Sequence, residues 1–119
     1  MRKTLVIAAF LLYAGAIRGD DGNDLVDKCR AAVNDGGNDY AAGFCGGLVF
    51  GVSQHVPHSI PAEVTLGQLT RVVYKYLQDH PEELRMADYT LIRRAIWDAW
   101  PPTQAQRAAF YDYYIHIRE

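Results

Sequence analysis

The stretch Tyr40-Ala-Ala-Gly-Phe-Cys-Gly-Gly-Leu-Val-Phe-Gly-Val52 mixes small residues and one cysteine with bulky apolar side chains. Gly43, Gly47 and Gly51 recur every four residues, so on an α-helix they form one strip without side chains, against which another backbone can lie closely. Glycine weakens an isolated helix by up to about 1 kcal/mol relative to alanine, so the segment needs tertiary contacts. We therefore expect a central, close-packed helix here, with a glycine-rich strand or loop as the alternative.

The composition is that of an ordinary globular chain. Half of the 119 residues are hydrophobic, 22% are charged, and the formal net charge is −2. This length suggests one domain. The slightly acidic balance provides no basic field for nucleic acid, so a nucleic-acid partner is not expected.

The first residues have the form of a secretory signal. Arg2 and Lys3 precede an apolar run over residues 5–16, and Ala14-Gly15-Ala16 is the small-x-small pattern that signal peptidases cut. We interpret residues 1–16 as a cleaved signal peptide, so that the mature chain is exported and has no membrane segment. The alternative is an N-terminal anchor, although the run is shorter than the ~20 residues a bilayer span needs.

Export places both cysteines, Cys29 and Cys45, in an oxidising compartment, where an even count favours one disulfide. Such a bridge adds on the order of 3 kcal/mol in the chain-entropy model. The alternatives are a catalytic thiol, which needs a histidine base, and a metal site, which needs three or four ligands. Neither cysteine has a histidine beside it in the sequence.

Two helices are expected before residue 54. Residues 20–23 are polar and expected to fray, and Asn23 or Asp24 is expected to cap the first helix. Its apolar positions follow helical spacing at Leu25, Val26, Cys29, Ala32 and Val33. The turn at 34–38 sends the chain back, so a helix over about 39–53 should run antiparallel to the first, joined to it by the disulfide.

Three further helices follow. Thr65-x-x-Gln68 and Thr103-x-x-Gln106 both have the form of a capping box at a helix start. Between these two helices, Pro81 and two glutamates should open a long helix that ends near Trp100. The expected apolar seam of this long helix consists of Leu84, Ala87, Leu91, Ala95 and Ala99, widened by Ile92 and Ile96. The expected apolar face of the preceding helix consists of Leu66, Leu69, Val72, Val73, Tyr76 and Leu77. The class is all-α, a compact bundle of about five helices with one disulfide.

Residues 54–63 read as an exposed connection with two prolines and the pair His55-x-x-His58. Two imidazoles without a clear third carboxylate or cysteine are more typical of a surface than of a metal site. We therefore expect no metal and no cofactor.

An ordered set of motifs now resembles a known family. The set is Cys29, Cys45-Gly-Gly-Leu-Val-Phe-Gly-Val52, Pro61-x-x-Val-Thr-x-x-Gln68, Val72-Val-x-x-Tyr-Leu-x-x-His-Pro-Glu82 and Ala95-Ile-x-x-Ala-Trp-Pro101. In this order it resembles the Rap/Tai family of immunity proteins, over about residues 25–102. The resemblance implies a small periplasmic helical protein that protects a bacterium from a peptidoglycan amidase delivered by type VI secretion. Such proteins inhibit by covering or plugging a papain-like cleft, commonly as a homodimer, and are not enzymes.

We therefore divide the chain into the signal peptide (1–16), an immunity domain (17–102) that resembles the Rap/Tai family, and a C-terminal aromatic helix (103–119). Phe110 and Tyr114 of this helix are expected to pack on the domain. Family members that resemble this chain usually have two further cysteines, and Ser59 and Pro102 stand at those positions here. Both cysteines are missing together, as expected if they normally pair with each other. The rigidity of the 54–63 connection is therefore in question. The extra helix after Pro102 would clamp the same end of the domain by packing.

The expected partner-binding residues are His55, His58 and Ser59, because an inhibitor of a narrow cleft needs a protruding segment and imidazoles can hydrogen-bond near a catalytic cysteine. A solvated connecting loop is the plain alternative for this segment. The helix faces with Arg71 and Lys75, or with Arg93 and Arg94, are alternative contact surfaces. A different class of function is a periplasmic helical stress or chaperone-like protein with no toxin partner. An enzyme would require a thiol dyad of Cys45 with His55 or His80.

Overall fold

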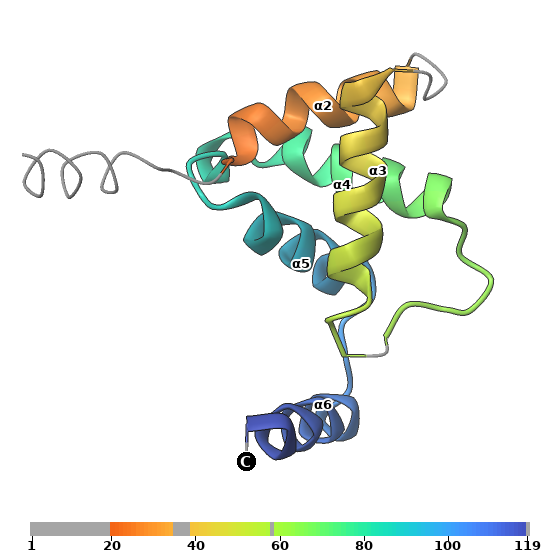
Figure 1. Cartoon of the computed structure of the whole chain (residues 1–119), viewed down its shortest axis with the longest axis vertical. Helices are drawn as coiled ribbons and strands as arrows, with labels where there is room; N and C mark the ends of the chain where they lie inside the picture. The colour runs from red at the N-terminus through yellow and green to blue at the C-terminus, as the bar shows by residue number, and fades with distance from the viewer. Residues whose placement is uncertain (1–19, 35–38, 58, 119) are drawn as a thin grey trace, which may run out of the picture.

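The computed structural model describes residues 20–34, 39–57 and 59–118, with side chains as far as Asp112. Within these residues the fold is all-α, as predicted (Figure 1). The helices are α2 (Gly22–Asn34), α3 (Tyr40–Ser53), α4 (Leu66–Asp79), the short 3₁₀ helix η1 (Pro81–Glu83), α5 (Asp88–Ala99) and α6 (Gln104–Arg118). The predicted signal peptide and His58 lie outside the described residues.

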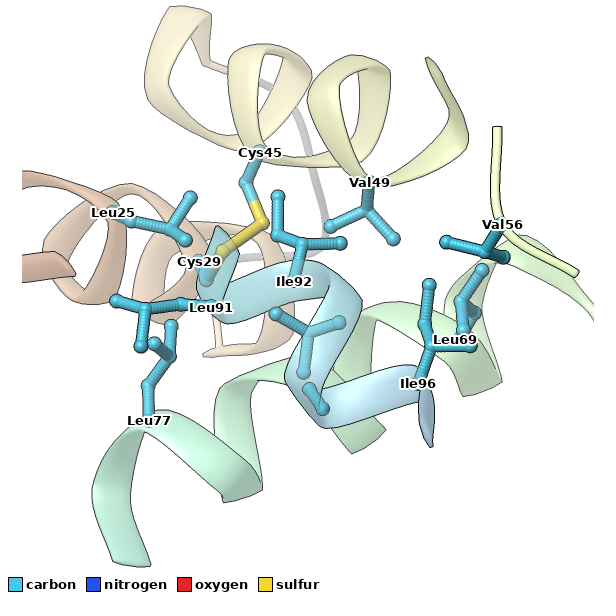
Figure 2. Packing of buried hydrophobic residues seen from close by; sticks show 12 residues of the cluster. Leu25, Cys29, Cys45, Val49, Val56, Leu69, Leu77, Leu91, Ile92 and Ile96 are labelled. Carbon is cyan, nitrogen blue, oxygen red and sulfur yellow. A yellow bond between two sulfur atoms is a disulfide. The ribbon is translucent and has the colours of Figure 1, made fainter. Parts of the chain in front are cut away.

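One apolar core joins α2, α3, α4 and α5 (Figure 2). Its buried members are Leu25, Cys29, Cys45, Val49, Val56, Leu69, Val73, Leu77, Leu91, Ile92, Ala95 and Ile96. The disulfide between Cys29 and Cys45 lies inside this core, and both cysteines are 0% exposed. The prediction of a single bridge is therefore confirmed. The bridge fixes α3 to α2 where the two helices meet.

The relative direction of the first two helices differs from the prediction. Figure 1 shows α3 crossing α2 steeply, where an antiparallel alignment was expected. The disulfide between Cys29 and Cys45 joins the two helices where they pack together.

α3 is a helix, but its glycine strip does not contact another helix. The buried positions are Ala42, Cys45 and Val49, which occupy one face at helical spacing. A Cβ atom built on Gly43, Gly47 or Gly51 would meet nothing within 4 Å. The prediction that a neighbouring helix packs on this strip is therefore wrong within one chain. α3 contacts the core with its opposite face, which carries Cys45 and Val49.

The segment before α2 is held in place and does not fray. Asp21 forms an isolated antiparallel bridge with Ala87, and the Asp88 N–H donates to the Asp20 carbonyl at 3.2 Å. The Asp21 carboxylate, and not Asn23 or Asp24, caps α2, because Oδ1 accepts the N–H groups of residues 23 and 24 at 3.0 and 3.3 Å. These bonds hold the pKa of Asp21 below its usual value.

The same bridge explains why the predicted long helix from Pro81 to Trp100 is interrupted. Ala87 has ψ 142°, an extended conformation that pairs with Asp21 and ends any continuous helix at this point. The chain therefore forms η1, a turn and then α5. Of the predicted seam, Leu91, Ile92, Ala95 and Ile96 are buried, but Ala99 is exposed; on α4, Leu66 is also exposed.

Both predicted capping boxes are present. In α4, Thr65 and Gln68 exchange side-chain-to-backbone bonds, and Thr103 and Gln106 do the same at 2.8 and 3.1 Å before α6. α6 lies apart from the four-helix core in Figure 1. Phe110 is half-buried, and the Tyr114 side chain lies outside the described residues, so the packing of this pair on the domain stays a prediction.

Candidate functional site

The loop after α3 is anchored at its centre. His55 is exposed, but Val56 is 3% exposed and Pro57 is buried. Ser59 is half-buried, and both its N–H and its hydroxyl donate to the Pro57 carbonyl, at 2.7 and 3.3 Å. The expectation of a wholly exposed connection is therefore wrong at Val56 and Pro57. The burial of Val56 and Pro57 attaches this part of the loop to the domain without the missing family cysteine.

His55 lines an open groove between α3 and α5. The groove has a volume of about 390 Å³. Its lining residues are Gly47, Leu48, Gly51, Val52, His55, Val56, Tyr89 and Arg93. Tyr89, which is 57% exposed, was missed by sequence reasoning, since nothing in the sequence relates it to a segment more than thirty positions earlier.

The electrostatic character of this groove is simple. No residue of α3 carries a charge, so one wall is uncharged along its whole length. The opposite edge carries Arg93, whose guanidinium carbon lies 5.4 Å from the centre of the Trp97 ring. An uncharged groove with a guanidinium at one edge can bind an apolar side chain of a partner that also carries a carboxylate nearby. The arrangement is therefore suited to binding.

The other basic residues named from the sequence lie elsewhere. Arg71 lines a second groove of about 240 Å³ between α2, α3 and α4. Lys75 is paired with Asp79 at 2.6 Å, and Arg94 with Glu83 at 2.9 Å. The structure thus places Arg71 and Arg93 at grooves, while Lys75 and Arg94 are engaged in ion pairs.

A group of possible metal ligands does lie at η1, where atoms of His80, Glu82 and Glu83 come within 4.8 Å of one another. The Glu83 carboxylate is already engaged, because it accepts the Tyr76 hydroxyl at 2.7 Å and the Arg94 guanidinium at 2.9 Å. A cation at this point would have to displace an arginine. We read the cluster as a hydrogen-bonded junction that joins α4, η1 and α5.

This junction predicts a pH dependence of stability. Burial, helped by the bond to Glu83, raises the pKa of Tyr76 to about 12. A phenol with a raised folded-state pKa contributes stability below its unfolded pKa of about 10 and loses it as the pH rises toward 12. We expect Tyr76→Phe to be less stable at neutral pH by about 1 kcal/mol and to show a flatter decline in stability above pH ~10. Urea titrations at several pH values measure the free energy of unfolding of the wild type and the variant. If the stability of the variant fell above pH ~10 as steeply as that of the wild type, this role of the hydroxyl would be contradicted.

The thiol dyad is not available. Cys45 is bonded to Cys29, and the chain has no other cysteine. Neither sulfur is therefore a thiolate nucleophile in the oxidised protein.

The family of Rap1a immunity proteins matches residues 21–102, from the capping residue of α2 to the end of α5 and on to the second of the two prolines that follow Trp100. The chain belongs to this family. No curated protein and no solved structure shows detectable similarity to it.

Rap1a membership makes this chain an immunity protein, and membership of such a family implies that it binds an effector protein. The match contains the four core helices, both cysteines and the loop with His55 and Ser59, whereas α6 lies beyond it. No helix among the described residues is long and apolar enough to span a membrane.

Proposed function

We propose that this Rap1a protein is exported to the periplasm and neutralises a peptidoglycan amidase delivered by type VI secretion, by occluding the cleft of the amidase. The observation that carries the proposal is the family match over residues 21–102. The buried disulfide supports export, because such bridges persist in oxidising compartments. The proposal includes a homodimer, in keeping with the Rap/Tai resemblance.

The loop of residues 55–59 is the part of the chain best suited to enter a cleft. An inhibitor loses affinity when a flexible loop must be ordered on binding. Here Val56 and Pro57 are buried in the domain while His55, directly before them, is exposed. The anchor therefore presents the exposed imidazole at low entropic cost. We propose that His55, His58 and Ser59 contact the amidase near its catalytic cysteine.

An inhibition assay tests this contact. The variant His55→Ala/His58→Ala should inhibit a papain-like peptidoglycan amidase at least roughly tenfold more weakly than the wild type, a loss of about 1.4 kcal/mol in binding. Its thermal stability should change little, because His55 is exposed. Lys75→Ala is the matched control, since Lys75 lies on α4 outside both grooves and is 75% exposed.

Equal inhibition by the double variant and the wild type would remove the loop from the interface while leaving the immunity function open. Protection of cells that express a periplasm-directed amidase tests the function itself. A chain that fails to protect against any such amidase when exported, or that remains in the cytoplasm with residues 1–16 attached, would contradict the proposal.

A further inference from the structure

Two arginines lie over the ring of Trp97, one from α5 and one from α6. The guanidinium carbon of Arg93 is 5.4 Å from the ring centre, and that of Arg107 is 5.9 Å from it. Both arginines are exposed, whereas Trp97 is half-buried. The ring therefore brings two positive charges from different helices to one place on the surface.

Neither of these guanidiniums forms an ion pair with a carboxylate among the described residues. Other basic side chains in that part of the chain do form such pairs. The pairs are Lys28 with Asp20, Arg30 with Asp27, Lys75 with Asp79, and Arg94 with Glu83. A guanidinium that lies over a ring uses its face for that contact. The N–H groups at the edge of Arg93 and of Arg107 are therefore available to bind a carboxylate in the two-bond manner typical of arginine.

The groove between α3 and α5 extends this cationic surface. Arg93 lines the groove, and the described lining contains no aspartate or glutamate. No residue of α3 carries a charge that could neutralise the guanidinium. His55 and Tyr89 line the same groove and are exposed. An acidic segment bound at Arg93 would therefore lie next to the loop that we propose as the contact with the amidase.

The start of α6 is fixed, which gives Arg107 a defined position. Pro102 is buried, and the capping box of Thr103 sets the first turn of the helix. The Arg107 N–H donates to the Thr103 carbonyl at 3.0 Å. A charged group that is already held in place loses less conformational entropy on binding. Arg107 also lies outside the family match, which ends at residue 102.

We propose that Arg93, Trp97 and Arg107 form a docking site for an acidic segment of the effector, whose aspartate or glutamate side chains pair with the two guanidiniums. The inference rests on the proposed function and deepens it, because it names the chemistry that the immunity protein recognises. Complementary charges add specificity and speed of association more than raw affinity. Because Arg107 belongs to α6, this helix contributes to the choice of effector.

Titration of the ¹⁵N-labelled mature chain with the peptide hexaglutamate tests the site without any effector. The buried indole N–H of Trp97 has no hydrogen-bond partner, and its NMR signal, assigned with Trp100→Phe, should shift in a saturable way. Hexaglutamine should not shift it. Arg93→Gln and Arg107→Gln should each weaken hexaglutamate binding at least roughly threefold. Arg71→Gln is the matched control and should bind like the wild type, because Arg71 is also exposed but lines the other groove.

The three arginine variants should keep the helical content and the melting temperature of the wild type, since all three side chains are exposed. Arg93→Gln leaves α6 unchanged, so it tests the site even where Arg107→Gln loosens that helix. The docking site is overturned if hexaglutamate leaves the Trp97 signal unmoved, or if the Arg93→Gln/Arg107→Gln chain binds the peptide as tightly as the wild type.

An inhibition assay with the same variants separates this inference from the proposed function. Against a papain-like peptidoglycan amidase that the wild type inhibits, the Arg93→Gln/Arg107→Gln chain should inhibit at least roughly tenfold more weakly, and inhibition by the wild type should weaken as the salt concentration rises. Equal inhibition by the double variant overturns the docking site and leaves the proposed function intact. If the wild type inhibits no such amidase, the proposed function fails, and the hexaglutamate titration then decides by itself whether the two arginines bind an acidic segment.

Discussion

Replacing Cys29 and Cys45 together by alanine is expected to lower the free energy of unfolding by about 2–5 kcal/mol, the range for native disulfides in small secreted domains. The bridge closes a segment of 16 residues and lies fully inside the core. Its loss releases the unfolded chain from a constraint, and the missing sulfurs leave a gap between α2 and α3. Because it links α2 to α3 directly, the effect should extend over the whole four-helix core.

Urea titration of the wild type and the double variant, with and without a reducing agent, measures this effect. The reduced wild type should move toward the variant, and the variant itself should not respond to reduction, which makes it the control. A variant within about 1 kcal/mol of the oxidised wild type would show that apolar packing alone holds α3 on α2.

Gly22→Ala is the second substitution with a large expected effect, a loss of about 1–3 kcal/mol through overpacking. Gly22 is buried at the start of α2, and an added Cβ would lie within 3 Å of the Leu91 side chain and of the Leu84 backbone. The backbone contact cannot be relieved by a rotamer change. The bond from the Gly22 N–H to the Met86 carbonyl, 3.1 Å long, would be strained as well.

Gly47→Ala is the matched control, because an added Cβ meets nothing within 4 Å there. In dilute solution this variant should be more stable than the wild type, by up to about 1 kcal/mol, since alanine favours the helix. The midpoints of urea unfolding of both variants give the comparison. If Gly22→Ala were as stable as the wild type, the tie between residues 20–22 and the start of α5 would not be a part of the folded core.

Local signals in the sequence predicted much of this fold. The capping boxes at Thr65 and Thr103 depend on groups three residues apart, so sequence spacing is enough to recognise them. The buried residues of α5 from Leu91 to Ile96 follow helical periodicity for the same reason. The disulfide was predictable because only two cysteines are present.

The wrong predictions share one cause, which is competition from residues far away in the chain. Local signals favour a continuous helix through Ala87, but Asp21, 66 positions earlier, pairs with Ala87 and interrupts the helix. Helical spacing on α3 defined two candidate packing faces, and only the position of α2, α4 and α5 decided that Cys45 and Val49 face the core. The groove that unites His55, Tyr89 and Arg93 depends on the same packing.

The sequence by itself therefore determined the all-α class, the starts of α4 and α6, the single disulfide and the family to which the chain belongs, because each depends on residue types at short or countable spacings. Only the tertiary structure decided that the glycine strip of α3 faces solvent, that Gly22 is buried, and that the loop after α3 is anchored at Val56 and Pro57. The physical reason is that burial is a property of the whole packed assembly: a helix has several faces, and its neighbours determine which of them loses contact with water.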